Sequence, residues 1–263
     1  MEFKHLLFSA EAGIATITFN RPKSLNALNG DLLGELSQAL DAVSADENIR
    51  VLILTGSGEK AFVAGADINE LAQCNALQGK WFAAKGQNAI NKLQSIDIPV
   101  IAAVNGYALG GGSEIALACD FVYASENAMF GLPEITLGLV PGFGGTQRLS
   151  RLVGINMAKE MIFTGKMISA QEAKEIGMVN KVTASADLMA EVKKTATAMA
   201  AKGKVALRAA KQVINAGVQV DLATGCKMEV DAFALCMASE DAKEGTTAFL
   251  EKRKAVFKGT LMG

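Results

Sequence analysis

The chain has 263 residues, which is enough for one large domain or for a core with a smaller appended part. Half of the residues are hydrophobic, so the chain can bury a sizeable core and is not expected to be disordered. The formal net charge is −1, with acidic and basic residues interspersed, which argues against a nucleic acid as the partner.

The first third of the chain predicts two strands separated by a loop and a helix. Residues 13–19 alternate apolar and small polar side chains, as a strand does, and residues 20–29 form a turn-rich loop. Asn29 offers a capping group for a helix at 32–43, whose apolar residues recur at helical spacing. Residues 50–56 are mostly apolar, which predicts a strand buried on both faces.

A glycine-containing turn follows at residues 62–68 and leads into a predicted helix at 69–74. Such a turn can leave backbone amides free near Ala66, and Asp67 is placed to cap the helix. An ordinary loop between a strand and a helix is the alternative interpretation. A helix at 77–93 and a short buried strand at 99–104 come next.

The stretch at residues 105–114 contains three consecutive glycines between that strand and a buried helix expected from residue 115. Glycines at such a junction expose backbone amides where the helix dipole is positive. Glu114 ends the stretch in apolar surroundings, so its carboxyl must find a partner or work with a shifted pKa. The spacing does not fit a dinucleotide-binding G-x-G-x-x-G motif, and a plain glycine turn before a helix remains the alternative.

A second carboxylate, Glu134, stands directly after a proline in a loop of apolar neighbours. It follows a predicted strand at 120–124. A glycine-dense segment at 137–148 then leads into a helix at 148–153. Beyond it the pattern predicts a helix at 157–163, a helix at 169–176 capped by Ser169, a short strand at 177–182, and helices at 187–201, 204–215, 224–237 and 246–257. The chain is therefore predicted as α/β up to about residues 185–200 and helical after that.

The single histidine and the four cysteines exclude several kinds of site. His5 is expected on an exposed first strand, so a histidine-based triad or a multi-histidine metal site is not predicted. The cysteines form no CxxC pair and no metal spacing, and Cys119 is expected to be a small buried hydrophobe. Without a signal-like or membrane-spanning apolar run, we expect a reduced cytoplasmic protein that does not enter a membrane.

Six blocks of the chain resemble the crotonase (enoyl-CoA hydratase/isomerase) superfamily, in the family's order and over nearly the whole length. These blocks are residues 20–28, beginning Asn20-Arg21-Pro22, residues 61–68, residues 99–114, Phe130-Gly131-Leu132-Pro133-Glu134, residues 141–149 and residues 249–254. The resemblance is greatest to the bacterial short-chain hydratases. It implies an α/β spiral of ββα units with the active site at residues 1–195. It also implies a C-terminal helical region at 196–263 that assembles homotrimers or homohexamers.

The same resemblance implies the roles of four groups. The backbone amides of Ala66 and Gly111 would hold the carbonyl oxygen of an acyl-CoA thioester. Glu114 would activate a water molecule and Glu134 would protonate Cα. The implied reaction is reversible syn addition of water to a short trans-2-enoyl-CoA, with no metal and no cofactor apart from the coenzyme A of the substrate. Two carboxyls close together in an apolar pocket cannot both ionise easily, so one pKa should lie nearer neutral.

Contacts with coenzyme A and the acyl chain are implied for a further set of residues: Ser24, Leu25, Ala27, Ala64, Asp67, Ile68, Leu132 and Lys252. Two positions depart from the family pattern. Leu132 stands where many hydratases have glutamine, and Asn69 stands where some relatives carry lysine. Both departures bear on substrate identity and affinity rather than on the type of reaction.

Four alternatives to a short-chain hydratase are considered. A Δ3,Δ2-enoyl-CoA isomerase, or a hydratase for a specialised cyclic or dienoyl-CoA, would share the fold. A non-catalytic RNA-binding member would need a basic stripe, and the chain offers only the short cluster at 252–254. A serine hydrolase using Ser113 would have to take its histidine from His5, the only one available.

Overall fold

The computed structural model describes residues 2–259, in which the strands form two sheets. The larger sheet has the order β1 (Leu6–Glu11), β2 (Ile14–Phe19), β3 (Val51–Gly56), β5 (Val100–Val104), β7 (Phe121–Ser125) and β10 (Lys181–Thr183). The smaller sheet has the order β4 (Ala61–Ala64), β6 (Tyr107–Leu109), β8 (Met129–Gly131) and β9 (Met167–Ser169). Neighbouring strands are parallel except for the pairs β1–β2 and β8–β9.

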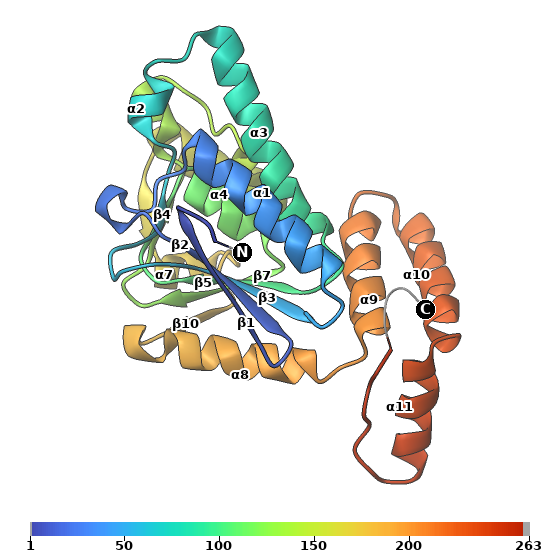
Figure 1. Cartoon of the computed structure of the whole chain (residues 1–263). Coiled ribbons are helices and arrows are strands. Elements are labelled where there is room, and N and C mark those ends of the chain that lie inside the picture. The colour runs from blue at the N-terminus through green and yellow to red at the C-terminus, as the bar shows by residue number, and fades with distance from the viewer. Residues whose placement is uncertain (1, 260–263) are drawn as a thin grey trace.

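Both faces of the larger sheet are covered, as the run of apolar residues in β3 predicts. On one face, helix α8 (Leu188–Ala200) packs its buried side chains against Val51 and Ile53 of β3. Leu52 and Leu54 point the other way, toward helices α1 (Gly30–Ala45) and α3 (Ala76–Ser95) and the smaller sheet (Figure 1). This alternation confirms that β3 is a strand buried on both faces.

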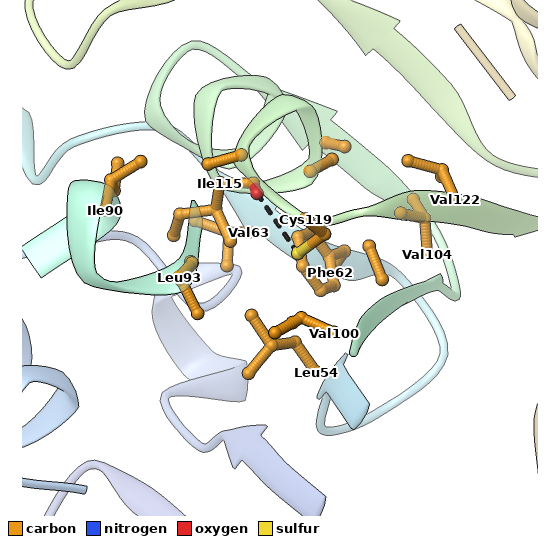
Figure 2. Packing of buried hydrophobic residues seen from close by; sticks show 14 of the residues in the cluster. Leu54, Phe62, Val63, Ile90, Leu93, Val100, Val104, Ile115, Cys119 and Val122 are labelled. Carbon is orange, nitrogen blue, oxygen red and sulfur yellow. Dashed lines mark hydrogen bonds between the residues drawn. The ribbon is translucent and has the colours of Figure 1, made fainter. Parts of the chain in front are cut away.

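The main core lies between the larger sheet, the smaller sheet and helices α3 and α4 (Gly111–Ala118), as Figure 2 shows. Cys119 lies in this core, 9% exposed, and its thiol donates a hydrogen bond to the carbonyl oxygen of Ile115 at 3.3 Å. Its prediction as a small buried hydrophobe is confirmed.

The remaining elements connect these layers. They are η1 (Pro22–Ser24), α2 (Ile68–Leu71), η2 (Pro133–Leu137), α5 (Gly145–Val153), α6 (Ile155–Thr164), α7 (Ala170–Glu175) and η3 (Ser185–Asp187). The predicted caps are present: Asn29, Asp67 and Ser169 each accept a hydrogen bond from a backbone amide in the first turn of a helix. No helix in residues 2–259 combines the length and the apolarity needed to cross a membrane.

The C-terminal helices stand apart from the sheets, at the right of Figure 1. They are α9 (Lys204–Gly217), α10 (Leu222–Met237) and α11 (Glu240–Leu250). Large apolar side chains on α10 and α11 face solvent in the single chain, namely Leu222, Val230, Phe233, Leu235, Phe249 and Leu250. The predicted division after residue 195 falls inside α8, whose Ala196 is buried on the larger sheet.

Several sequence predictions are wrong in detail. His5 was expected to be exposed but is nearly buried, with 9% of its surface accessible. It packs against α1, where its ring nitrogen Nδ1 lies 3.1 Å from Oε1 of Glu35. The last helix begins at Glu240 rather than at 246 because the hydroxyl of Ser239 caps it, and it ends at Leu250. The strand expected at 177–182 is reduced to Lys181–Thr183. The short strands β6 and β8 were not expected at all.

Candidate active site

The candidate site lies where three parallel strands of the smaller sheet end together. Leu109 at the end of β6 pairs with Ala64 of β4 on one side and with Gly131 of β8 on the other. Because carboxyl ends of parallel strands meet at one edge of a sheet, the residues that follow them lie near one another. Those residues are Ala66 after β4, Gly111 and Glu114 after β6, and Glu134 after β8.

The glycine turn after β6 depends on close contacts that a side chain would prevent. Gly110 has φ of +50°, and a Cβ there would lie 2.7 Å from Oε1 of Glu134. A Cβ on Gly112 would lie 1.9 Å from the carbonyl oxygen of Val63 in β4. Helix α4 can therefore begin at Gly111, directly against the neighbouring strand. The sequence prediction that the helix starts at residue 115 is wrong for this reason.

The turn leaves one backbone amide free, and the turn after β4 leaves another. In the described part of the chain neither Ala66 N nor Gly111 N donates a hydrogen bond. The residues on either side of Ala66 are hydrogen-bonded to Leu28. The amide of Leu28 donates to the carbonyl of Gly65 at 2.8 Å, and its carbonyl accepts from the amide of Asp67 at 2.7 Å. Two free amides on adjacent turns can bind an oxygen that becomes negative during a reaction.

Glu114 is a buried carboxylate held at one oxygen. Its side chain is almost wholly enclosed, and Oε1 accepts the amides of Phe143 at 2.8 Å and Gly145 at 2.7 Å. Burial, and to a lesser extent the negative charge of Glu134, raises the pKa of Glu114 to about 7, although the two amides and the cation of Arg148 act in the opposite direction. Near neutral pH this carboxyl can therefore gain or lose a proton.

Glu134 lies in η2, on the other side of the glycine turn. Its Oε2 is buried and has no hydrogen-bond partner among residues 2–259. Burial raises the pKa of Glu134, so the protonated form is favoured relative to a carboxyl in water. An unpartnered buried carboxyl oxygen is costly in a resting protein and is suited to exchanging a proton with a ligand.

A cavity of about 430 Å³ brings these groups together. The predicted residues Ala64, Ala66, Ile68, Gly111, Glu114 and Glu134 all line it. The rest of the wall is mainly apolar and was not predicted: Leu71, Phe82, Leu109, Leu137, Leu139, Val140 and Phe143. Of these, Leu137, Leu139 and Val140 form an apolar run in the sequence, and the structure leaves them exposed. An apolar run next to Glu134 is the sequence signal that could have identified them.

Some residues predicted to contact substrate lie beside the cavity rather than on its wall. Ser24, Leu25 and Ala27 belong to the loop that runs along the β4 turn, where the amide of Ala64 donates to the carbonyl of Leu25 at 3.0 Å. Asp67 caps α2 and forms an ion pair with Arg21 at 2.9 Å. The hydrogen bond from Arg21 lowers the pKa of Asp67, and a contact of Asp67 with substrate stays a prediction.

Leu132 and Lys252 are also absent from the cavity wall. Leu132 is 1% exposed and packs behind Glu114, where a Cβ on Gly145 would lie 3.1 Å from its Cδ2. Lys252 is exposed and follows α11, at the opposite end of the molecule from α2 (Figure 1). Within one chain these two predictions are not supported by the cavity lining, because Leu132 points into the core and Lys252 follows a distant helix.

Ser113 is a structural residue and not a nucleophile. It is fully buried, its hydroxyl donates to the carbonyl of Ala108 at 2.6 Å, and it accepts the amide of Gly131 at 3.2 Å. His5 is engaged with Glu35 on α1. In the described residues, no group of three histidine, cysteine or acidic side chains is arranged to hold a metal ion.

Comparison with known proteins gives consistent matches along the chain. A family model described as enoyl-CoA hydratase/isomerase matches residues 9–260. The chain is 49% identical to crotonyl-CoA hydratase of Syntrophomonas wolfei over 98% of its own length and 99% of that protein. It is also 49% identical to short-chain-enoyl-CoA hydratase of Clostridium acetobutylicum, with 97% of each covered. The crystal structure of an enoyl-CoA hydratase from Bacillus anthracis superposes with a TM-score of 0.94 at 44% identity, covering 97% of this chain and 99% of that one.

Proposed function

The chain belongs to the enoyl-CoA hydratase/isomerase family, and we propose that it is a short-chain enoyl-CoA hydratase acting on trans-2-enoyl-CoA thioesters such as crotonyl-CoA. The observation that carries the proposal is the convergence of two buried carboxyls and two free backbone amides on one apolar cavity. An apolar cavity with a few convergent polar groups is the usual form of a site that binds a small organic substrate.

The free amides suit the thioester. When water adds to Cβ, electron density moves to the carbonyl oxygen, which becomes enolate-like. The amides of Ala66 and Gly111 would donate to this oxygen, and Gly111 adds the positive end of helix α4. Losing one donor of this kind typically costs roughly 3–4 kcal/mol of transition-state stabilisation.

The two carboxyls suit the proton transfers. Oε1 of Glu114 is occupied by two amides, so its other oxygen is available to accept a proton from water as the water oxygen bonds to Cβ. Glu134, protonated, would deliver its proton to Cα on the same face of the double bond. In the reverse reaction Glu134 takes the Cα proton and Glu114 protonates the departing hydroxyl. No metal or redox cofactor is required, because the two side chains supply both transfers.

Coenzyme A and oligomer contacts complete the proposal. The loop containing Ser24, Leu25 and Ala27 lies against the β4 turn, so it can hold the coenzyme A portion at the edge of the cavity. Because Lys252 lies far from the cavity of its own chain, a contact between Lys252 and substrate requires a neighbouring subunit. The exposed apolar side chains of α10 and α11 support assembly into a trimer or a dimer of trimers.

The test is the loss of the 2-enoyl thioester absorbance of crotonyl-CoA on addition of purified protein without metal or redox cofactor. Glu114→Gln and Glu134→Gln should each abolish most of the activity, whereas Glu126→Gln, an exposed acid after β7, should leave it unchanged. Full activity in either of the first two variants would refute the assigned roles. A protein inert toward crotonyl-CoA but able to convert a 3-enoyl-CoA would be an isomerase instead.

A further inference from the structure

The amides that hold Glu114 belong to a turn formed by residues 142–145, and Arg148 folds back onto that turn. One guanidinium nitrogen, Nη1, donates to the carbonyl of Phe143 at 3.1 Å. The guanidinium can lie this close because residue 144 is glycine: a Cβ there would be 2.3 Å from Nη1, and φ is +105°. Arg148 thus binds the peptide unit between residues 143 and 144, which lies between the two units whose amides bind Glu114.

Helix α3 holds the other side of the guanidinium. Nη2 of Arg148 donates to Oδ1 of Asn91 at 2.6 Å, and Nε donates to Oε1 of Gln94 at 3.2 Å. Together with the Phe143 carbonyl, these acceptors are all neutral. The fork geometry of arginine therefore connects the turn to α3 through one hydrogen bond to the turn and two to α3.

The location of this cation is unusual for a purely structural residue. Arg148 lies in the first turn of α5 (Gly145–Val153), the end of a helix where a positive charge is disfavoured. It is half-buried, and the acidic groups that interact with its charge are the carboxyl of Glu114 and, secondarily, the thiol of Cys119. It does not line the substrate cavity. An effect of Arg148 on the reaction is therefore indirect and passes through the turn at 142–145, which holds Glu114.

We propose that Arg148 is a positioning residue for hydration: it fastens the turn at 142–145 to helix α3, so that this turn holds one oxygen of Glu114 and leaves the other facing the cavity. This inference rests on the proposed function. The segment from residue 142 to residue 148 would thus orient the carboxyl of Glu114, and Arg148 would do so without contacting substrate.

The charge of Arg148 has a second consequence. Among the charged groups acting on Glu114, Glu134 of η2 raises its pKa and Arg148 of α5 lowers it, whereas α3 presents only neutral amides to this cluster. Removing the cation should therefore raise the pKa of Glu114 and shift the ionised form of the base to higher pH.

The experiment compares Arg148→Gln and Arg148→Lys with Arg151→Gln, a matched control on the exposed face of the same helix. For Arg148→Gln we expect kcat on crotonyl-CoA to fall roughly 100-fold with little change in KM. The acidic limb of its pH profile should move to higher pH. Arg148→Lys keeps the charge but loses the fork, so its limb should stay in place while kcat falls roughly tenfold. Arg151→Gln should match the wild type.

A readout that needs no turnover separates this inference from the proposed function. The carboxyl carbon of Glu114, observed by NMR with isotope-labelled glutamate and assigned through Glu114→Gln, should titrate at higher pH in Arg148→Gln than in the wild type. A wild type inactive on crotonyl-CoA refutes the proposed function, and the titration still decides the role of Arg148. An unmoved Glu114 titration, or wild-type kcat in both Arg148 variants, overturns the inference.

If Arg148→Gln does not fold, the acceptors on α3 provide the test. Asn91→Ala removes one anchor and should lower kcat severalfold with KM unchanged, and Asn88→Ala on the exposed part of the same helix should do nothing. Equal behaviour of these two variants would refute the proposed positioning role.

Discussion

The two carboxyls of the site stand on walls of very different construction. Glu114 belongs to the buried helix α4, and its Oε1 is held by two backbone amides. Glu134 belongs to η2, which continues into exposed apolar residues, and its Oε2 has no partner in the described chain. The wall around Glu114, here the base wall, is complete before substrate arrives. The wall around Glu134, here the acid wall, leaves apolar surface that a ligand would cover. It also leaves one carboxyl oxygen that a ligand would hydrogen-bond.

The largest expected difference between the walls comes from their glycines. In Gly112→Ala the new methyl would overlap the carbonyl oxygen of Val63, so the sheet or the helix must move. We expect a loss of roughly 4 kcal/mol or more in the free energy of unfolding, or failure to fold. In Gly138→Ala on the acid wall the methyl meets open space, and only the positive φ of +72° is unfavourable, costing roughly 1–2 kcal/mol.

Urea unfolding of the two variants beside the wild type measures this contrast. Equal destabilisation would show that the base wall tolerates an added methyl group as well as the acid wall does, which would contradict the tight packing at Gly112.

How far the sequence predicts this arrangement depends on whether a signal is local. The helix caps and the doubly buried strand β3 follow from a few neighbouring residues, and the structure confirms them. Strands β6 and β8 have three residues each, too few to show an alternating pattern, and exist because they pair with β4 and β9. The burial of His5 likewise depends on Glu35, which is distant in sequence.

The same distinction applies to the site. Resemblance to a family identified the acids and the amide positions that line the cavity, because short motifs carry them. The contact of Phe143 with α3 could not be predicted. It requires a glycine at position 86, where a Cβ would lie 2.2 Å from the ring of Phe143, and the two residues are far apart in the chain. Residues that meet only through packing leave no pattern in one sequence.

A pH series of stability tests the buried charge of the base wall. The pKa of Glu114 is raised from 4.5 to about 7 in the folded protein, so the folded state binds a proton more tightly than the unfolded state does. The stability from this group is full below pH 4.5 and is lost as the pH rises toward about 7. The loss should be about 3 kcal/mol, since each unit corresponds to about 1.4 kcal/mol.

Glu114→Gln is the matched variant for that series, because it removes the titration while an amide oxygen can still accept the two backbone bonds. Between pH 4.5 and 7 the variant should therefore gain stability relative to the wild type, measured as the difference in free energy of unfolding. Above pH 7 this difference should stay constant. A difference independent of pH would mean that Glu114 is not desolvated as described.

A pH profile of activity compares the two acids directly. Hydration needs Glu114 ionised and Glu134 protonated, so kcat/KM should fall as the pH drops below about 7 and fall again at high pH when Glu134 loses its proton. The profile should be bell-shaped, with limbs that belong to the coupled pair. Steady-state rates on crotonyl-CoA across this range provide the measurement, and a profile that keeps rising with pH would contradict a protonated acid at Glu134.

The smallest expected effect belongs to the exposed part of the acid wall. Val140 lines the cavity and is 70% exposed in the single chain, so Val140→Ala should change the free energy of unfolding by less than about 0.5 kcal/mol. If substrate covers this wall, the lost methyl groups should raise KM for an acyl-CoA by roughly threefold to tenfold, with kcat nearly unchanged. Val256→Ala, at an exposed valine outside the cavity, is the control and should leave KM unaltered. The measurement is the ratio of KM between Val140→Ala and the wild type for acyl-CoA substrates of increasing chain length. If this ratio does not grow with chain length, the acyl chain lies against the base wall instead.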